Sequence, residues 1–154
     1  MKKLLVVMVA LILSIMSAGC SGKNETPQKA AANAMEAVKT VNAATLETYF
    51  GTSAILGEDV SEDMLKAFTS NLTYKTGAVK SIDNVLNVVT TITNVDMSVA
   101  LASVDLDSAA TDEEKAQLLT DAIAANADAT ATFTVNIPCE KTDNGWKIPL
   151  TEDL

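Results

Sequence analysis

The sequence contains no histidine and no arginine among its 154 residues. Without histidine, a Ser-His-Asp triad, a Cys-His dyad and a histidine-ligated zinc site are excluded. Without arginine, the bidentate clamps that bind carboxylates and phosphates are excluded as well. The side chains that remain for chemistry are carboxylates, lysines, two tyrosines and cysteine.

Cysteine, aromatic residues and positive charge are scarce. The cysteines are Cys20 and Cys139, so if one is modified the other has no partner and no disulfide framework forms. Aromatic residues make up 4% of the chain, which predicts an aliphatic core. Cys139 alternates in register with Val135 and Ile137, which predicts a buried, inert thiol, with a reactive nucleophile beside Lys141 as the alternative. The chain has eleven lysines and 20 acidic residues. This negative net charge disfavours nucleic acid binding and polybasic attachment to anionic lipid.

The densest acidic run is Asp105 and Asp107, followed by residues 112–114. Hard cations favour oxygen ligands, but the spacing lacks the glycine-turned loop of an EF-hand. We therefore predict a solvated surface that caps helices, with a weak calcium site as the alternative. No motif for a metal ion or an organic cofactor stands out, and neither is predicted.

The first 20 residues have the layout of an export signal. Lys2 and Lys3 precede an apolar run from Leu4 to Met16, and small residues then lead to Cys20. A helix of roughly 13 residues is about 20 Å long, against about 30 Å for the hydrocarbon core of a bilayer. The run is thus too short for a membrane-spanning helix.

Residues 17–20, Ser-Ala-Gly-Cys, resemble the lipobox of bacterial lipoproteins, although its first place is usually Leu. The resemblance implies that Cys20 receives a diacylglyceryl group and becomes the first mature residue. Two acyl chains hold a protein stably on a membrane, which one chain does not. We expect a signal peptide at 1–19, a lipidated Cys and tether at 20–26, and one domain at 27–154 on the outer face of the cell membrane. The alternative is a plain secretory signal with an incidental cysteine.

The segment after the tether predicts three helices. Thr26 suits an N-cap and Pro27 suits the first helical position. A second helix fits residues 43–50 and ends at Gly51, where a left-handed stop is favoured. Ser61 is suited to cap a third.

From residue 71 the pattern becomes that of strands. Strands are predicted at 71–82, with a bend at Gly77, and at 85–95, 129–140 and 146–150. Because residues 85–95 are apolar on both faces, this strand is expected to be central and covered on both sides.

A helical insert separates the second and third strands. Asp96 is suited to cap its first helix, and Thr111 with Glu114 forms a capping box for its last, which runs to about residue 126. The order of helices, two strands, insert and hairpin predicts an α+β fold.

This order resembles the small NTF2-like (cystatin-like) lipoproteins of Gram-positive bacteria, many of them domains of unknown function. The resembling parts are the lipobox, the alanine-rich first helix, VVTTITNVDM at 88–97 and KTDNGWKI at 141–148. The resemblance implies a curved antiparallel sheet of about four strands around the long first helix, leaving a conical pocket.

Three functions fit this outline. The first is a non-enzymatic domain that binds an apolar ligand in the cone, a peptide or a second copy of itself, with Tyr49, Tyr74, Asp96 and Trp146 as candidate contacts. The second is an isomerase- or hydrolase-type enzyme using Asp96 with a tyrosine, which requires a raised carboxyl pKa in an apolar pocket. The third is a structural envelope role, which requires a filled cone and an apolar outer sheet face. The structural alternatives to these functional roles are that Asp96 caps a helix and that Trp146 packs in the core.

Overall fold

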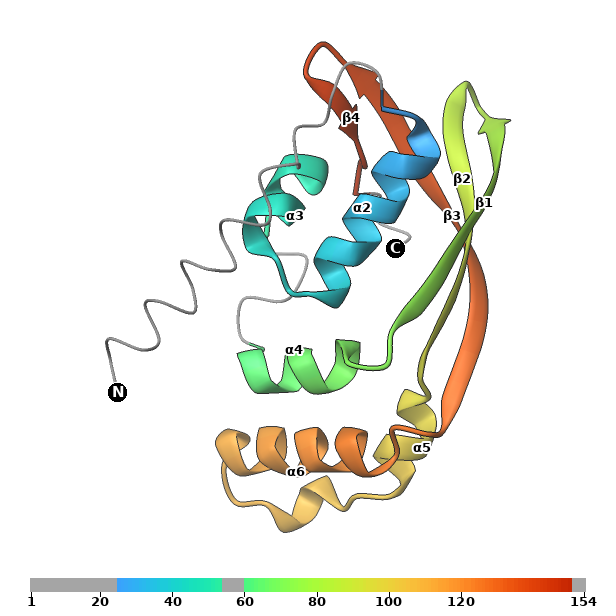
Figure 1. Cartoon of the computed structure of the whole chain (residues 1–154). Coiled ribbons are helices and arrows are strands. Elements are labelled where there is room, and N and C mark those ends of the chain that lie inside the picture. Colours follow the sequence, from blue (N-terminus) through green and yellow to red (C-terminus); the bar gives the residue numbers. More distant parts are fainter. Residues whose placement is uncertain (1–24, 54–59, 151–154) are drawn as a thin grey trace, which may run out of the picture.

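A computed structural model describes residues 25–53 and 60–150 of the chain. The predicted signal peptide, lipobox and Cys20 lie outside these residues. The described residues form an α+β fold, in which helices pack on one side of an open four-stranded antiparallel sheet (Figure 1). In chain order the elements are α2 (Pro27–Lys39), α3 (Ala43–Phe50), α4 (Glu62–Thr69), β1 (Thr73–Ile82), β2 (Val85–Val95), α5 (Met97–Ala102), the 3-10 helix η2 (Leu106–Ser108), α6 (Asp112–Ala125), β3 (Thr130–Thr142) and β4 (Gly145–Lys147).

The helix boundaries follow the capping signals of the sequence. The hydroxyl of Thr26 accepts a hydrogen bond from the backbone of α2, which starts at Pro27 as predicted. Gly51 ends α3 with a φ of +76°, a conformation that strains any residue with a Cβ. Ser61 caps α4, and Thr111 caps α6 in a complete capping box. The predicted helical insert is confirmed as α5, η2 and α6.

The sheet has the strand order β1-β2-β3-β4, and all its pairings are antiparallel. The register shifts between Thr76 and Val79, at the bend predicted for Gly77. A Cβ on Gly77 would lie 3.2 Å from the carbonyl oxygen of Val89, so the two strand backbones approach closely there. Strand β4 pairs with the last three residues of β3.

Strand β2 is central as predicted, but the expectation of cover on both sides is wrong. The helices lie on one side of the sheet (Figure 1), and the other side carries exposed threonines such as Thr91 and Thr134. On that face the hydroxyls of Thr93 and Thr132 are 2.7 Å apart. Threonine is β-branched and favours strands, yet its hydroxyl is readily hydrated, so a threonine-rich strand does not require a covering layer.

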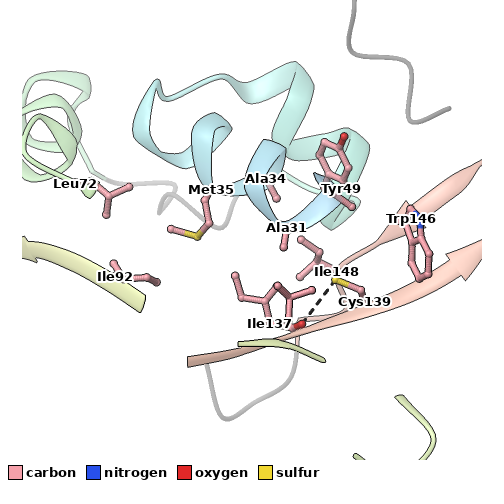
Figure 2. Close-up of a cluster of buried hydrophobic side chains, with 12 residues drawn as sticks. Ala31, Ala34, Met35, Tyr49, Leu72, Ile92, Ile137, Cys139, Trp146 and Ile148 are labelled. Carbon is pink, nitrogen blue, oxygen red and sulfur yellow. Dashed lines mark hydrogen bonds between the residues drawn. The ribbon is translucent and has the colours of Figure 1, made fainter. Parts of the chain in front are cut away.

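The main core fills the space between α2 and the sheet. Ala30, Ala31 and Ala34 are at most 1% exposed, and their small side chains let α2 approach the strands closely. Figure 2 shows Met35 of α2 and the side chains of Ile137 and Ile148 in this layer. Side chains of α2 and of the sheet therefore pack against each other in this space.

The core is mainly aliphatic as predicted, and it also holds two aromatic residues, of which Trp146 was expected to pack there. Tyr49 and Trp146 are buried in the cluster, at 1% and 7% exposure. Phe133 has the register of inward-facing residues, because it pairs with buried Ile92, but it stays 48% exposed. Strand alternation assigns a side chain to a face, whereas its burial depends on whether a helix reaches that part of the face.

A second, smaller cluster lies at the other end of the sheet. Val95, Ala100 and Ile123 form its buried centre, and side chains from α4 and α6 pack around it. This cluster joins α4, α5 and α6 into one helical layer, seen at the bottom of Figure 1. Among the described residues, no helix is long and apolar enough to cross a membrane.

Candidate ligand-binding site

An apolar cavity of about 320 Å³ opens within the layer formed by α4, α5 and α6. It lies in the size range of small-molecule sites, which begins at about 300 Å³. The residues that line it are Val38, Val60, Met64, Leu65, Phe68, Thr69, Met97, Leu119 and Ile123. Helix spacing explains the lining, because Met64 and Phe68 are one turn apart on α4, as are Leu119 and Ile123 on α6.

The lining offers almost no polar group to a ligand. Its single hydroxyl, on Thr69, donates to the carbonyl oxygen of Leu65 at 2.9 Å and is thus satisfied within α4. Met64 and Met97 contribute thioether side chains, which are flexible and polarisable and adapt to the shape of a guest. This chemistry favours an apolar molecule over a charged or sugar-like one.

None of the four predicted contact residues lines this cavity. Asp96 is adjacent in sequence to Met97, which does line it. The candidates are also not gathered in one place: Tyr49 and Trp146 meet near the start of α2, whereas Tyr74 and Asp96 have separate partners. The sequence contained no signal that the lining residues surround a space.

Tyr49 and Trp146 both form hydrogen bonds with Glu25, the first described residue. The indole nitrogen of Trp146 donates to the carbonyl oxygen of Glu25 at 2.7 Å. The carboxylate of Glu25 accepts from the hydroxyl of Tyr49 at 3.1 Å and from the side chain of Asn33 at 2.7 Å. Burial, together with the charge of Glu25, raises the pKa of Tyr49 although the Asn33 hydrogen bond opposes this shift. Both aromatic residues therefore act as structural anchors.

Asp96 is the N-cap of α5. Its carboxylate accepts from the hydroxyl of Ser98 at 2.6 Å and from the Ser98 backbone at 2.9 Å. These hydrogen bonds lower the pKa of Asp96, which the enzyme hypothesis requires to be raised. Asp96 therefore lacks the property of a general acid in an apolar pocket.

Tyr74 donates a hydrogen bond to the carboxylate of Glu36 on α2 at 3.0 Å. Burial, followed by the hydrogen bond to Glu36 and the charge of Glu36, raises the pKa of Tyr74 to about 12. Because the folded-state pKa lies above the unfolded value of 10.0, the stabilisation from this group is complete below pH 10 and is lost as the pH rises through about 12.

We expect Tyr74 in the variant Tyr49→Phe, where it is the remaining tyrosine, to ionise near pH 12 in the folded chain and near its ordinary value after unfolding in urea. The ultraviolet absorbance of tyrosinate measures both midpoints. Adding Glu36→Gln should lower the folded midpoint, since it removes the charge beside the hydroxyl. A folded midpoint near 10 would contradict the Tyr74–Glu36 hydrogen bond.

Cys139 and the acidic run have structural roles. Cys139 is 2% exposed, and burial raises the pKa of its thiol to about 11, so it is an inert core residue as predicted. Asp105 caps η2, and Glu114 completes the capping box of α6. Within residues 25–53 and 60–150, no group of three or more Asp, Glu, Cys or His side chains is arranged to hold a metal ion.

The sequence-based search did not single out Asn94. It is 4% exposed, and its side-chain oxygen Oδ1 has no hydrogen-bond partner among the described residues. A buried unsatisfied acceptor destabilises a fold by about 1–3 kcal/mol. The burial of Asn94 follows from strand alternation, which the sequence shows. Residue 94 lies an even number of positions from Val88 and Ile92, so its side chain is on the same inward face of β2.

The fold and the cavity together define a class: a small α+β domain with helices on one face of an open antiparallel sheet and an apolar cavity in its helical layer. A scan against protein-family models finds no match. Searches of curated proteins and of solved structures find no significant match either.

Proposed function

We propose that this chain is a bacterial lipoprotein whose NTF2-like (cystatin-like) domain binds a small apolar ligand without catalysing a reaction. Diacylglyceryl-Cys20 holds it on the outer face of the cell membrane. The observation that carries the ligand proposal is the cavity of about 320 Å³ lined by apolar side chains. The long helix α2 on a curved sheet is consistent with the NTF2-like class.

The ligand site differs in position from the cone expected of that class. Alanines of α2 pack on the sheet in the main core, whereas the cavity is lined chiefly by α4 and α6, with Met97 of α5 and Val38 of α2. An apolar molecule in the cavity would replace water against Met64, Leu119 and Ile123. Each Å² of apolar surface so buried contributes about 25 cal/mol.

The test is binding of the neutral apolar probe N-phenylnaphthylamine to the mature chain carrying Cys20→Ser, which has no acyl chains to dissolve the probe. We expect a saturable fluorescence increase at one probe per chain. Leu119→Trp, which extends a larger ring into the cavity, should weaken binding at least about tenfold, equivalent to about 1.4 kcal/mol. Native mass spectrometry of protein purified from its host would then identify a co-purified ligand.

The matched control is Leu101→Trp. Leu101 lies on α5, is 45% exposed and does not line the cavity, so this variant adds the same ring without obstructing the site. Its binding should equal that of the parent chain. Undiminished binding to Leu119→Trp would show that the probe sits elsewhere, and the cavity would then lose its proposed role.

Neither alternative function has comparable support. The enzyme hypothesis requires a raised pKa at Asp96, and the pKa is lowered instead. The structural hypothesis requires an apolar outer face on the sheet, and the outer face carries exposed threonines such as Thr91 and Thr134. The filled cone is the one feature that agrees with the structural hypothesis.

A further inference from the structure

The charges of the domain are separated between two regions. Residues 60–72 and 96–128, which form the helical layer with α4, α5 and α6, carry ten acidic side chains and two lysines. The other described residues, 25–53, 73–95 and 129–150, carry six of each sign. The whole net charge of the described residues thus belongs to the helical layer, which we call the acidic pole.

The anchor would emerge at the opposite end. Glu25 is the first described residue, and its hydrogen bonds to Trp146 and Tyr49 fix it beside the β3–β4 hairpin. Figure 1 shows the start of α2 and this hairpin at the end of the molecule away from α6. We call this end the tethered pole. Four residues lie between Cys20 and Glu25, so the Cα atoms of these two residues are five steps apart and separated by at most about 18 Å.

The acidic pole exposes the apolar side chains of Val99 and Leu101 on α5, so exposed apolar residues do not distinguish the two poles. The tethered pole exposes apolar side chains as well. The tip of the β1–β2 hairpin lies at the same end in Figure 1, and there Ile82 and Leu86 are 41% and 37% exposed. Lys141 lies over the ring of Trp146 in the neighbouring hairpin, at 6.0 Å from its centroid. A surface of mixed charge with apolar tips is compatible with phospholipid headgroups.

We propose that the tethered pole is a membrane-facing surface, against which anionic phospholipid headgroups pack, and that the acidic pole with its cavity is held outward. The inference rests on the proposed anchor at Cys20. A short tether keeps the domain near the bilayer, and like charge then disfavours every orientation that brings the acidic pole to anionic lipid. The cavity would consequently receive its ligand from the aqueous side and not directly from the bilayer.

The test uses the full lipidated protein in vesicles that contain phosphatidylglycerol and a headgroup-labelled acceptor lipid. Two variants, Asp143→Cys in the β3–β4 turn and Asp107→Cys in η2, each replace one exposed Asp and carry the same thiol-linked donor dye. Cys20 is blocked by its thioether, and Cys139 is buried with a raised pKa of about 11, so labelling is confined to the new cysteine.

We expect energy transfer from position 143 to exceed that from position 107 at least about twofold, because the 13-residue strand β3 separates the two poles by up to about 40 Å. High salt or uncharged phosphatidylcholine vesicles should reduce the difference. Equal transfer from both positions, or more from position 107, would overturn the orientation.

Flotation of the same vesicles separates the two proposals. Protein that floats with the lipid and shows equal transfer leaves the anchor standing and disproves the orientation alone. Protein that does not float lacks the anchor, which overturns the lipoprotein proposal and the orientation together.

Discussion

Replacing Cys20 with Ser is expected to release almost all of the protein from the membrane fraction. Each buried CH₂ of an acyl chain contributes about 0.8 kcal/mol to membrane binding, and stable attachment requires two chains. The mature chain has no substitute for them, because nine lysines against 20 acidic residues leave it with a net charge of −11 and no basic patch. Cell fractionation with incorporation of labelled fatty acid measures the effect.

Ser17→Leu is the matched control. It changes the lipobox toward its usual pattern, so labelled fatty acid and membrane attachment should both persist. If the parent protein itself appears unlabelled in the medium, the plain secretory signal is correct and Cys20 is incidental.

Replacing Trp146 with Ala is expected to lower the free energy of unfolding by about 3–5 kcal/mol. Trp146 is 7% exposed, lies in the main core and donates the hydrogen bond that holds Glu25. The loss would be a large fraction of the 5–15 kcal/mol typical of a native domain. Urea denaturation followed by circular dichroism is the suitable measurement, because the variant has no other tryptophan.

Two further variants separate the contribution of the Trp146 hydrogen bond from that of burying an aromatic ring. Trp146→Phe keeps most of the buried area and removes the indole donor, so it should lose about 1–3 kcal/mol, the effect of leaving a buried acceptor without its partner. Phe133→Ala removes an aromatic ring that is 48% exposed and should lose no more than about 1 kcal/mol. A stable Trp146→Ala that no longer binds an apolar probe would instead restore Trp146 as a ligand contact.

Local signals predicted most of the secondary structure. Thr26, Gly51 and Thr111 act at the helix ends where capping chemistry assigns them, because a cap depends on the backbone groups of its own first or last turn. The turn between β1 and β2 falls at Asp83 and Asn84, and both have positive φ values, which Asp and Asn adopt more readily than most residues. Such interactions span few residues, so a single sequence specifies them.

The errors concern layers and contacts between distant segments. β2 was expected to be covered twice because both of its faces are fairly apolar, although the threonines on its outer face do not require burial. Phe133 pairs with buried Ile92 and yet is 48% exposed, because alternation fixes the face of a strand and not the reach of a helix. The ligand contacts were sought in the cone, whereas the alanines of α2 close that space.

By itself, the sequence predicted an export signal and a lipobox at Cys20, and it determined the chemistry that the missing histidine and arginine exclude and the α+β order of elements. The tertiary structure decided where the cavity lies, that Tyr49 and Trp146 fix Glu25, and that the acidic helical layer lies away from the end where Glu25 is held. The physical reason is the separation along the chain over which each interaction acts. Charge, caps and strand period act between near neighbours, whereas a cavity or a pole exists only once helices far apart in the chain pack on one sheet.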